Sequence, residues 1–261
     1  MIAPWTGQTD RATAARLGVG DSGEISTMST FNTCIKTLSA ACLGIVLAAC
    51  SATVNDSITL ADGERHDGAL ATVNGSVELG ERAEVTGSVR TVNGGIRLGE
   101  QARAGRVETV NGSIRISAGA DVGGAATVNG AIELGENVSA TGDLATTNGR
   151  ITSQPGCRIS GDVATTNGTV RLYGTTVDGT VATTNGNLQI LDASRVAGGL
   201  HLRPREAGER AGELRVIIGP DSIIEGPILI ESPARLFVHE SATVGEVSGA
   251  EIERYAGERP E

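Results

Sequence analysis

Residues 109–116 read Thr-Val-Asn-Gly-Ser-Ile-Arg-Ile, and this stretch decides the fold. Its Thr-X-Asn-Gly core occurs seven times along the chain, at a spacing of 18 or 19 residues. The seven asparagines are Asn74, Asn93, Asn111, Asn129, Asn148, Asn167 and Asn185. Self-similarity at a short, fixed period is typical of a solenoid, in which each repeat forms one coil that stacks on the preceding coil.

One coil contains three short segments of alternating apolar and polar residues. In the coil from Val89 to Val107 these segments are 89–93, 95–98 and 102–107, and glycines separate them. Alternation indicates a half-buried strand, and glycine permits the tight turn between two strands. The pattern therefore predicts an all-β fold: a single-stranded parallel β-helix with 18–19-residue coils. Connections between parallel strands usually follow a right-handed path, so we expect a right-handed coil.

Three columns of apolar residues are expected to fill the core, one from each position that recurs in every coil. The first column follows Asn by three residues: Val77, Ile96, Ile114, Ile132, Ile151, Val170 and Leu188. The second follows Asn by five residues: Leu79, Leu98, Ile116, Leu134, Ser153, Leu172 and Ile190. The third precedes Asn by four residues: Val89, Val107, Ala125, Leu144, Val163 and Val181. Small and β-branched side chains suit the narrow interior of such a helix.

The asparagines are predicted to form a structural ladder rather than a ligand site. The position before Thr is charged in two coils, as Arg90 and Glu108, so its side chains are expected to face solvent. Because side chains alternate along a strand, Thr and Asn are then expected to point inward. Each Asn amide would then bond its neighbour inside the helix, where buried polar groups need partners. Asn129→Val should accordingly destabilise the fold by about 1–3 kcal/mol.

Two outward surfaces follow from the same parity. One is a small-residue wall, composed of a Val/Thr column (Val73, Val92, Val110, Val128, Thr147, Thr166 and Thr184) and an Ala-rich column (Ala71, Arg90, Glu108, Ala126, Ala145, Ala164 and Ala182). The other is a charged column: Glu78, Arg97, Arg115, Glu133, Thr152, Arg171 and Gln189. The wall is either a docking surface or an ordinary strand surface. The charged column is expected to be a solvated face.

The N-terminal region has the layout of a secretory leader. Lys36 precedes a short apolar run that ends in small residues, and the run is shorter than the ~20 residues that a membrane-spanning helix needs. Met28 is the expected start, which makes 1–27 an upstream extension and 28–49 the signal peptide. Leu47, Ala48, Ala49 and Cys50 resemble the bacterial lipobox. The resemblance implies cleavage before Cys50, lipidation of that residue and a membrane anchor; Ser51 after it implies the outer membrane, on its periplasmic or cell-surface face.

Composition restricts the partners. The chain carries a formal charge of −10, and removing 1–49 deletes three basic and three acidic residues, so the charge does not change. This balance argues against nucleic acid as a partner. Cys157 would be the only cysteine left besides Cys50, which excludes an intramolecular disulfide, and its expected role is that of a small buried residue.

The remaining boundaries follow from where the repeat starts and breaks. We expect a lipidated Cys and spacer at 50–56, the repeat domain at 57–202, a charged loop at 203–213, two further coils and a cap at 214–252, and a flexible tail at 253–261. The loop is the only sizeable insertion. The charged loop and tail favour a blocked C-terminal end and therefore a monomer.

Two family resemblances accompany these patterns. Thr-Val-Asn-Gly-Ser-Val-Glu-Leu at 72–79 and its counterpart at 109–116 resemble an adhesin-labelled family of bacterial β-strand repeats, over about 70–200. Val-Ile-Ile-Gly-Pro-Asp-Ser-Ile-Ile-Glu-Gly-Pro-Ile at 216–228 and Leu-Phe-Val-His-Glu-Ser-Ala at 236–242 resemble bactofilins, which are polymer-forming β-helix proteins. Bactofilins are typically cytoplasmic, which disagrees with the leader.

Three functions compete. The first is a non-catalytic cell-envelope lipoprotein whose β-helix acts as an adhesin-like or structural module and binds glycan or an envelope protein. The second is a self-assembling, polymer-forming envelope scaffold. The third, a polysaccharide-active β-helix enzyme, needs clustered carboxylates and aromatic residues. The repeat region offers only Tyr173 as an aromatic residue, and its carboxylates are scattered, so we expect no enzyme, no cofactor and no metal site.

Overall fold

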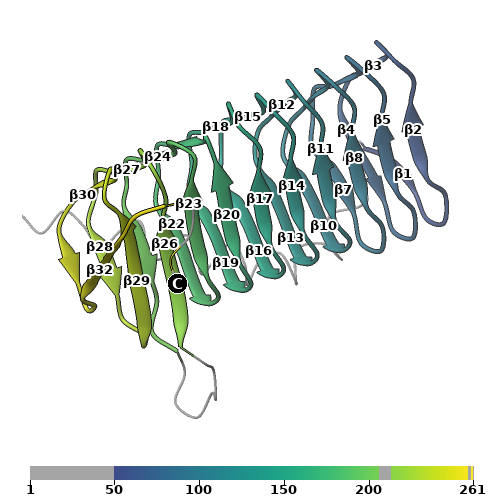
Figure 1. The fold of residues 1–261 in the computed structure, drawn as a ribbon. Coiled ribbons are helices and arrows are strands. Elements are labelled where there is room, and N and C mark those ends of the chain that lie inside the picture. The colour runs from purple at the N-terminus through teal and green to yellow at the C-terminus, as the bar shows by residue number, and fades with distance from the viewer. Residues whose placement is uncertain (1–49, 206–212, 258–259, 261) are drawn as a thin grey trace, which may run out of the picture.

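The computed structural model describes residues 50–205, 213–257 and Pro260. It is a β-solenoid in which the chain passes through three parallel sheets in turn and stacks coil upon coil (Figure 1). All strand pairs are parallel, and consecutive partners lie about one coil apart, as in Val107 with Ala125. The predicted all-β parallel helix is therefore confirmed.

The sheets are called A, B and C in the order in which each coil visits them. Sheet A has 11 strands: β1 (Cys50–Thr53), β4 (Ala69–Thr72), β7 (Val89–Thr91), β10 (Val107–Asn111), β13 (Ala125–Asn129), β16 (Leu144–Asn148), β19 (Val163–Asn167), β22 (Val181–Asn185), β25 (Leu200–Leu202), β28 (Ile228–Ile230) and β31 (Val247–Ser248). Sheet B has 11 strands: β2 (Ile58–Leu60), β5 (Val77–Leu79), β8 (Ile96–Leu98), β11 (Ile114–Ile116), β14 (Ile132–Leu134), β17 (Ile151–Ser153), β20 (Val170–Tyr173), β23 (Leu188–Leu191), β26 (Leu214–Ile218), β29 (Ala234–His239) and β32 (Ile252–Tyr255). Sheet C has 10 strands: β3 (Arg65–His66), β6 (Glu84–Val85), β9 (Arg103–Ala104), β12 (Asp121–Val122), β15 (Ser139–Ala140), β18 (Arg158–Ile159), β21 (Thr176–Val177), β24 (Arg195–Val196), β27 (Ile223–Ile224) and β30 (Thr243–Val244).

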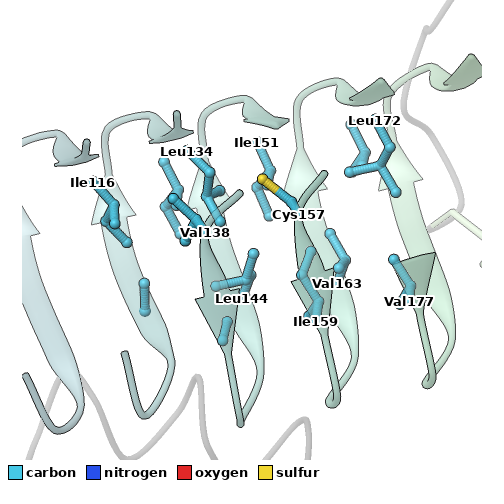
Figure 2. Packing of buried hydrophobic residues seen from close by; sticks show 14 of the residues in the cluster. Ile116, Leu134, Val138, Leu144, Ile151, Cys157, Ile159, Val163, Leu172 and Val177 are labelled. Carbon is cyan, nitrogen blue, oxygen red and sulfur yellow. The ribbon is translucent and has the colours of Figure 1, made fainter. Parts of the chain in front are cut away.

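The core runs along the axis between the three sheets, and all three predicted columns line it. No residue of these columns exceeds 2% exposure. Figure 2 shows Ile116, Leu134 and Leu172 from one column beside Leu144 and Val163 from another. Burial of these side chains supplies the main stabilisation, because each large aliphatic side chain contributes about 1.5–3 kcal/mol when removed from water.

Sheet C supplies a fourth set of core residues, which the three predicted columns do not include. The expected segment 102–107 is divided: β9 ends at Ala104, and Val107 begins the next strand of sheet A. The separation arises because Gly105 and Arg106 form a corner, so alternation does not continue across them. Inward residues of sheet C such as Val122 and Ile159 then complete the triangular core.

Cys157 is part of this core, as expected. Its side chain is 2% exposed and lies among apolar neighbours, with Sγ 3.0 Å from the carbonyl oxygen of Gly135 (Figure 2). Burial raises the pKa of the Cys157 thiol. The thiol is therefore held in its neutral, poorly nucleophilic form. The next coil carries Thr175 at the corresponding position, and its hydroxyl lies 2.6 Å from that of Ser153, the single polar member of the predicted columns.

The solenoid begins earlier than expected. The segment 50–56 was predicted to be a spacer, but Cys50–Thr53 forms β1, which pairs in register with β4. The lipobox residues Leu47, Ala48 and Ala49, the signal peptide at 28–49 and the extension at 1–27 lie outside the described residues. So do 206–212 within the charged loop.

The two C-terminal coils continue the stack after that loop. β26 pairs with β23, and β29 pairs with both β26 and β32. The side chain of Arg254 folds over the last coil and donates to the carbonyl oxygens of His239 and Ala242, at 3.1 and 3.3 Å. Ile252 nevertheless remains 40% exposed, so this end is only partly covered.

The glycine of each Thr-X-Asn-Gly is required by the stacking itself. A Cβ atom at this glycine in any of the seven copies would lie between 1.4 and 2.3 Å from a backbone carbonyl oxygen of the preceding coil. In the central copies that oxygen belongs to the equivalent glycine, so a column of glycines runs along the corner between sheets A and B. The next position is different: a Cβ at Gly95 would lie 3.3 Å from its nearest neighbour, and other coils carry Ser113 or Arg150 there.

Adjacent glycines in one coil provide a test. Gly94→Ala should destabilise the protein by about 2–3 kcal/mol, because its Cβ would overlap the carbonyl oxygen of Gly75 and push two coils apart. Gly95→Ala should change stability by less than about 1 kcal/mol. Chemical denaturation of both variants measures the difference. Equal stability of the two would contradict the proposed stacking constraint.

Candidate functional site

The Thr of the repeat points inward, as predicted, and ties each coil to the one before. Thr72, Thr91, Thr109, Thr127, Thr146, Thr165 and Thr183 are all buried. In the central copy, the hydroxyl of Thr127 donates to the carbonyl oxygen of Gly112 at 2.9 Å. The equivalent bond recurs in the other copies at 2.8–3.5 Å. The Thr column therefore satisfies the corner carbonyl groups from inside the helix.

The Asn residues do form a ladder, but the ladder lies on the surface. In each of the seven copies the side-chain Nδ2 donates to the Oδ1 of the Asn in the preceding coil, at 2.8–3.1 Å. All members are exposed except Asn185, which is half-buried. The expectation of an internal ladder was therefore wrong. The strand pairing explains this. Thr109 pairs with Thr127 and Asn111 pairs with Asn129, but the intervening Val110 and Val128 do not pair. The chain turns at this point, so the alternation of inward and outward side chains ends before Asn.

The ladder also has an eighth member that the sequence analysis missed. Asn74 donates to the Oδ1 of Asn55 at 2.9 Å. The signal was present, since Thr53-Val54-Asn55 repeats the pattern 19 residues before Asn74, but Asp56 replaces the glycine. This contact places the expected spacer inside the first coil.

The inward Thr and the outward Asn of one coil should differ in their contribution to stability. Thr127→Val removes a buried donor and should cost about 1–2 kcal/mol, because the carbonyl of Gly112 loses its partner away from water. Asn129→Val removes only exposed bonds that water replaces, and should cost less than about 1 kcal/mol. Melting curves of both variants, with Thr127→Ser as the hydroxyl-retaining control, measure this. A larger loss of stability for Asn129→Val than for Thr127→Val would support an internal Asn ladder.

The outer face of sheet A carries the small-residue wall. Ala126, Ala145, Ala164 and Ala182 form a buried cluster of their own, separate from the main core, while the neighbouring Val/Thr column is half-buried. The wall is interrupted at both ends by charge. Glu108 accepts a hydrogen bond from the Nε atom of Arg106 at 2.7 Å, and its other carboxylate oxygen forms an ion pair with Arg90.

At the other end of the Ala column, His201 pairs in register with Ala182 and places Nε2 2.6 Å from Glu231. These contacts join adjacent coils across the outer face. They stabilise the stack.

The outer face of sheet B carries the charged column, which is exposed or half-buried as predicted. Arg97 pairs with Glu78 at 3.4 Å, and Arg115 pairs with Glu133 at 2.9 Å. The next member of the column is the short side chain of Thr152, followed by Arg171. This change in side-chain length produces a groove.

The groove has a volume of about 550 Å³ and crosses strands β11, β14, β17 and β20. Arg115 and Glu133 form one wall, Arg171 and Tyr173 form the other, and Thr152 lies between them. Gly135 deepens the adjoining row because it has no side chain, and Gln154 and Arg150 complete the polar lining. From the sequence, Arg115, Glu133, Thr152 and Arg171 were expected only to form part of an ordinary solvated face. Tyr173 stood out only as the single aromatic residue of the repeat region.

The chemistry of this groove suits binding. Glu133 is its only carboxylate and is engaged by Arg115, whereas glycoside hydrolysis uses two carboxylates that flank the bond. Over the described residues, no three His, Cys, Asp or Glu side chains are arranged to hold a metal ion. The same part of the chain contains no helix with the length and apolar character needed to cross a membrane.

Comparison with known proteins yields no relative. No protein-family model matches the chain, and no curated protein or solved structure matches it. Functional inference therefore rests on the residues and their geometry.

Proposed function

We propose that the protein is a non-catalytic cell-envelope lipoprotein whose β-solenoid is an adhesin-like or structural binding module. The observation that carries this proposal is the outer face of sheet B, where side chains recur coil after coil around a polar groove. Such a face offers several polar contacts from successive coils on one stiff support. Linked contacts of this kind raise avidity without requiring any single strong site.

The anchor in this proposal is Cys50, which the lipobox resemblance implicates. Because Cys50 is also the first residue of β1, a mature chain beginning there would enter the solenoid directly. The binding module would then stand close to the outer membrane, with no long tether. Acyl chains retain such a protein because each buried methylene contributes about 0.8 kcal/mol.

Membrane fractionation tests the anchor. Cys50→Ala should move the protein from the membrane fraction to the soluble envelope fraction, because the residue that receives the lipid is lost. Cys157→Ala is the matched control: it makes the same substitution at a buried cysteine and should leave the protein in the membrane. If Cys50→Ala protein stays in the membrane as the unsubstituted protein does, the anchor is elsewhere.

The polymer-forming scaffold is the second candidate, and the C-terminal end favours it. Ile252 is 40% exposed on the last strand of sheet B, and in the C-terminal coils Leu229 on sheet A and Ile223 on sheet C are 37% and 41% exposed. An unpaired strand edge with apolar side chains can pair with another copy of the chain.

Two measurements on soluble Cys50→Ala protein separate binding from assembly. Immobilised on beads, it should retain isolated envelope fragments, while beads carrying the heat-unfolded protein should not. In light scattering it should remain monomeric as its concentration rises. Filaments that grow with concentration would support the scaffold instead, and equal retention by folded and unfolded protein would remove the binding module.

A further inference from the structure

We propose that the groove on sheet B binds a negatively charged polysaccharide, one that carries carboxylate or phosphate groups on its sugar rings. This inference rests on the proposed binding function and names its ligand class. It starts from the charge of the groove. Three arginines against one glutamate give its lining a formal charge of +2, although the whole chain carries −10.

Two of the three arginines of the groove, Arg150 and Arg171, differ from most other arginines in that they form no ion pair with another described residue. Arg65, Arg90, Arg97, Arg103, Arg106, Arg158, Arg195 and Arg235 each lie within ion-pair distance of a carboxylate. Among the described residues, neither Arg150 nor Arg171 has such a partner. The Nε atom of Arg171 is also buried without a hydrogen-bond acceptor in the described part of the chain. A buried donor without an acceptor is unfavourable.

The type of side chain selects the charged group of the ligand. Guanidinium presents its donors in a planar fork that matches carboxylate and phosphate oxygens. Arg150 and Arg171 lie in adjacent coils: Arg150 immediately precedes β17, and Arg171 is on β20. One anionic group, or two successive groups of one chain, can therefore contact both. Arg115 is already neutralised by Glu133 and serves as a wall.

The other lining residues suit a sugar rather than a bare anion. Tyr173, half-buried beside Arg171, presents an aromatic face to the apolar side of a ring and a hydroxyl at its edge. Thr152 and Gln154 add neutral hydrogen-bonding groups for sugar hydroxyls. The groove crosses four strands, about 14 Å at the ~4.8 Å spacing of paired strands, which is long enough for a short oligosaccharide segment.

A second groove on the same sheet shows that this charge is local. It measures about 460 Å³, and its lining includes Asp62, Glu78 and Glu81 but only one arginine, Arg97, which is paired. The two grooves share a strand geometry and differ in sign. An anionic polysaccharide is therefore expected to prefer the positively charged groove at Arg150 and Arg171 over the negatively charged one.

Binding is tested on the full chain, extracted in mild detergent, by titration at physiological salt. The probes are polygalacturonate, which carries carboxylates, a phosphomannan, which carries phosphates, and neutral dextran. At least one charged polymer should bind and dextran should not. Whichever charged polymer binds more tightly identifies the anionic group. Failure of both overturns the proposal, and the envelope-fragment assay then decides separately whether the binding module survives.

Substitutions locate the site. Arg150→Gln with Arg171→Gln should weaken polymer binding by about tenfold or more, as expected when charged hydrogen bonds are lost. Arg103→Gln with Arg158→Gln changes the net charge equally on sheet C and should alter affinity by less than about twofold. An equal loss in both double variants would mean diffuse attraction and would overturn the proposal.

Tyr173→Ala separates a sugar site from an anion site. It should weaken polymer binding by about threefold or more, since the ring contact is lost. Inorganic phosphate should bind far more weakly than the polymer and should not respond to this substitution. Phosphate binding as tight as that of the polymer would overturn the assignment to a polysaccharide.

Discussion

The whole structure depends on how closely the backbone stacks at the corner between sheets A and B. Glycine follows each of the seven asparagines from Asn74 to Asn185 because any Cβ there would collide with a carbonyl oxygen of the preceding coil. Once the corner is fixed at this spacing, neighbouring groups fall into register along the axis. The Thr hydroxyl bonds the corner carbonyl from inside, and the Asn amide bonds its neighbour from outside. One four-residue motif thus supplies the spacing, the inner ladder and the outer ladder.

This constraint leaves little freedom inside the helix and much outside it. The inward columns hold small or aliphatic side chains, since the interior is narrow: mostly Val, Ile, Leu and Ala, together with Cys157 and hydroxyl residues that are hydrogen-bonded. Outward positions face no such limit. A change in the length of one outward side chain is not absorbed by repacking, because the backbone beneath it is held by its neighbours. The short Thr152 between Glu133 and Arg171 therefore becomes a groove instead of a local collapse.

Features that depend on the regular repeat and on strand alternation could be predicted from the sequence. Features located where that regularity is interrupted could not. The columns starting at Val77, Leu79 and Val89 were correct because they lie within strands, where alternation holds. The Asn ladder itself was predicted correctly, but it was expected inside the helix and lies on the surface, because Asn is located where the chain turns. The first coil was missed because Asp56 replaces glycine after Asn55. The groove could not be predicted, because it needs the lateral neighbours of Thr152 and the ion pairs that leave Arg150 and Arg171 unneutralised.

A stiff groove has a consequence for affinity. A ligand that binds a flexible site must offset the cost of ordering that site, and this cost lowers the affinity. Here the strands under the groove are fixed by backbone pairing on both sides, and the nearby corners are fixed by the Thr and Asn ladders. Only side-chain rotamers remain to be ordered. A modest set of contacts around Arg150, Arg171 and Tyr173 can therefore suffice, and a long polymer that touches several molecules on one membrane would multiply their effect.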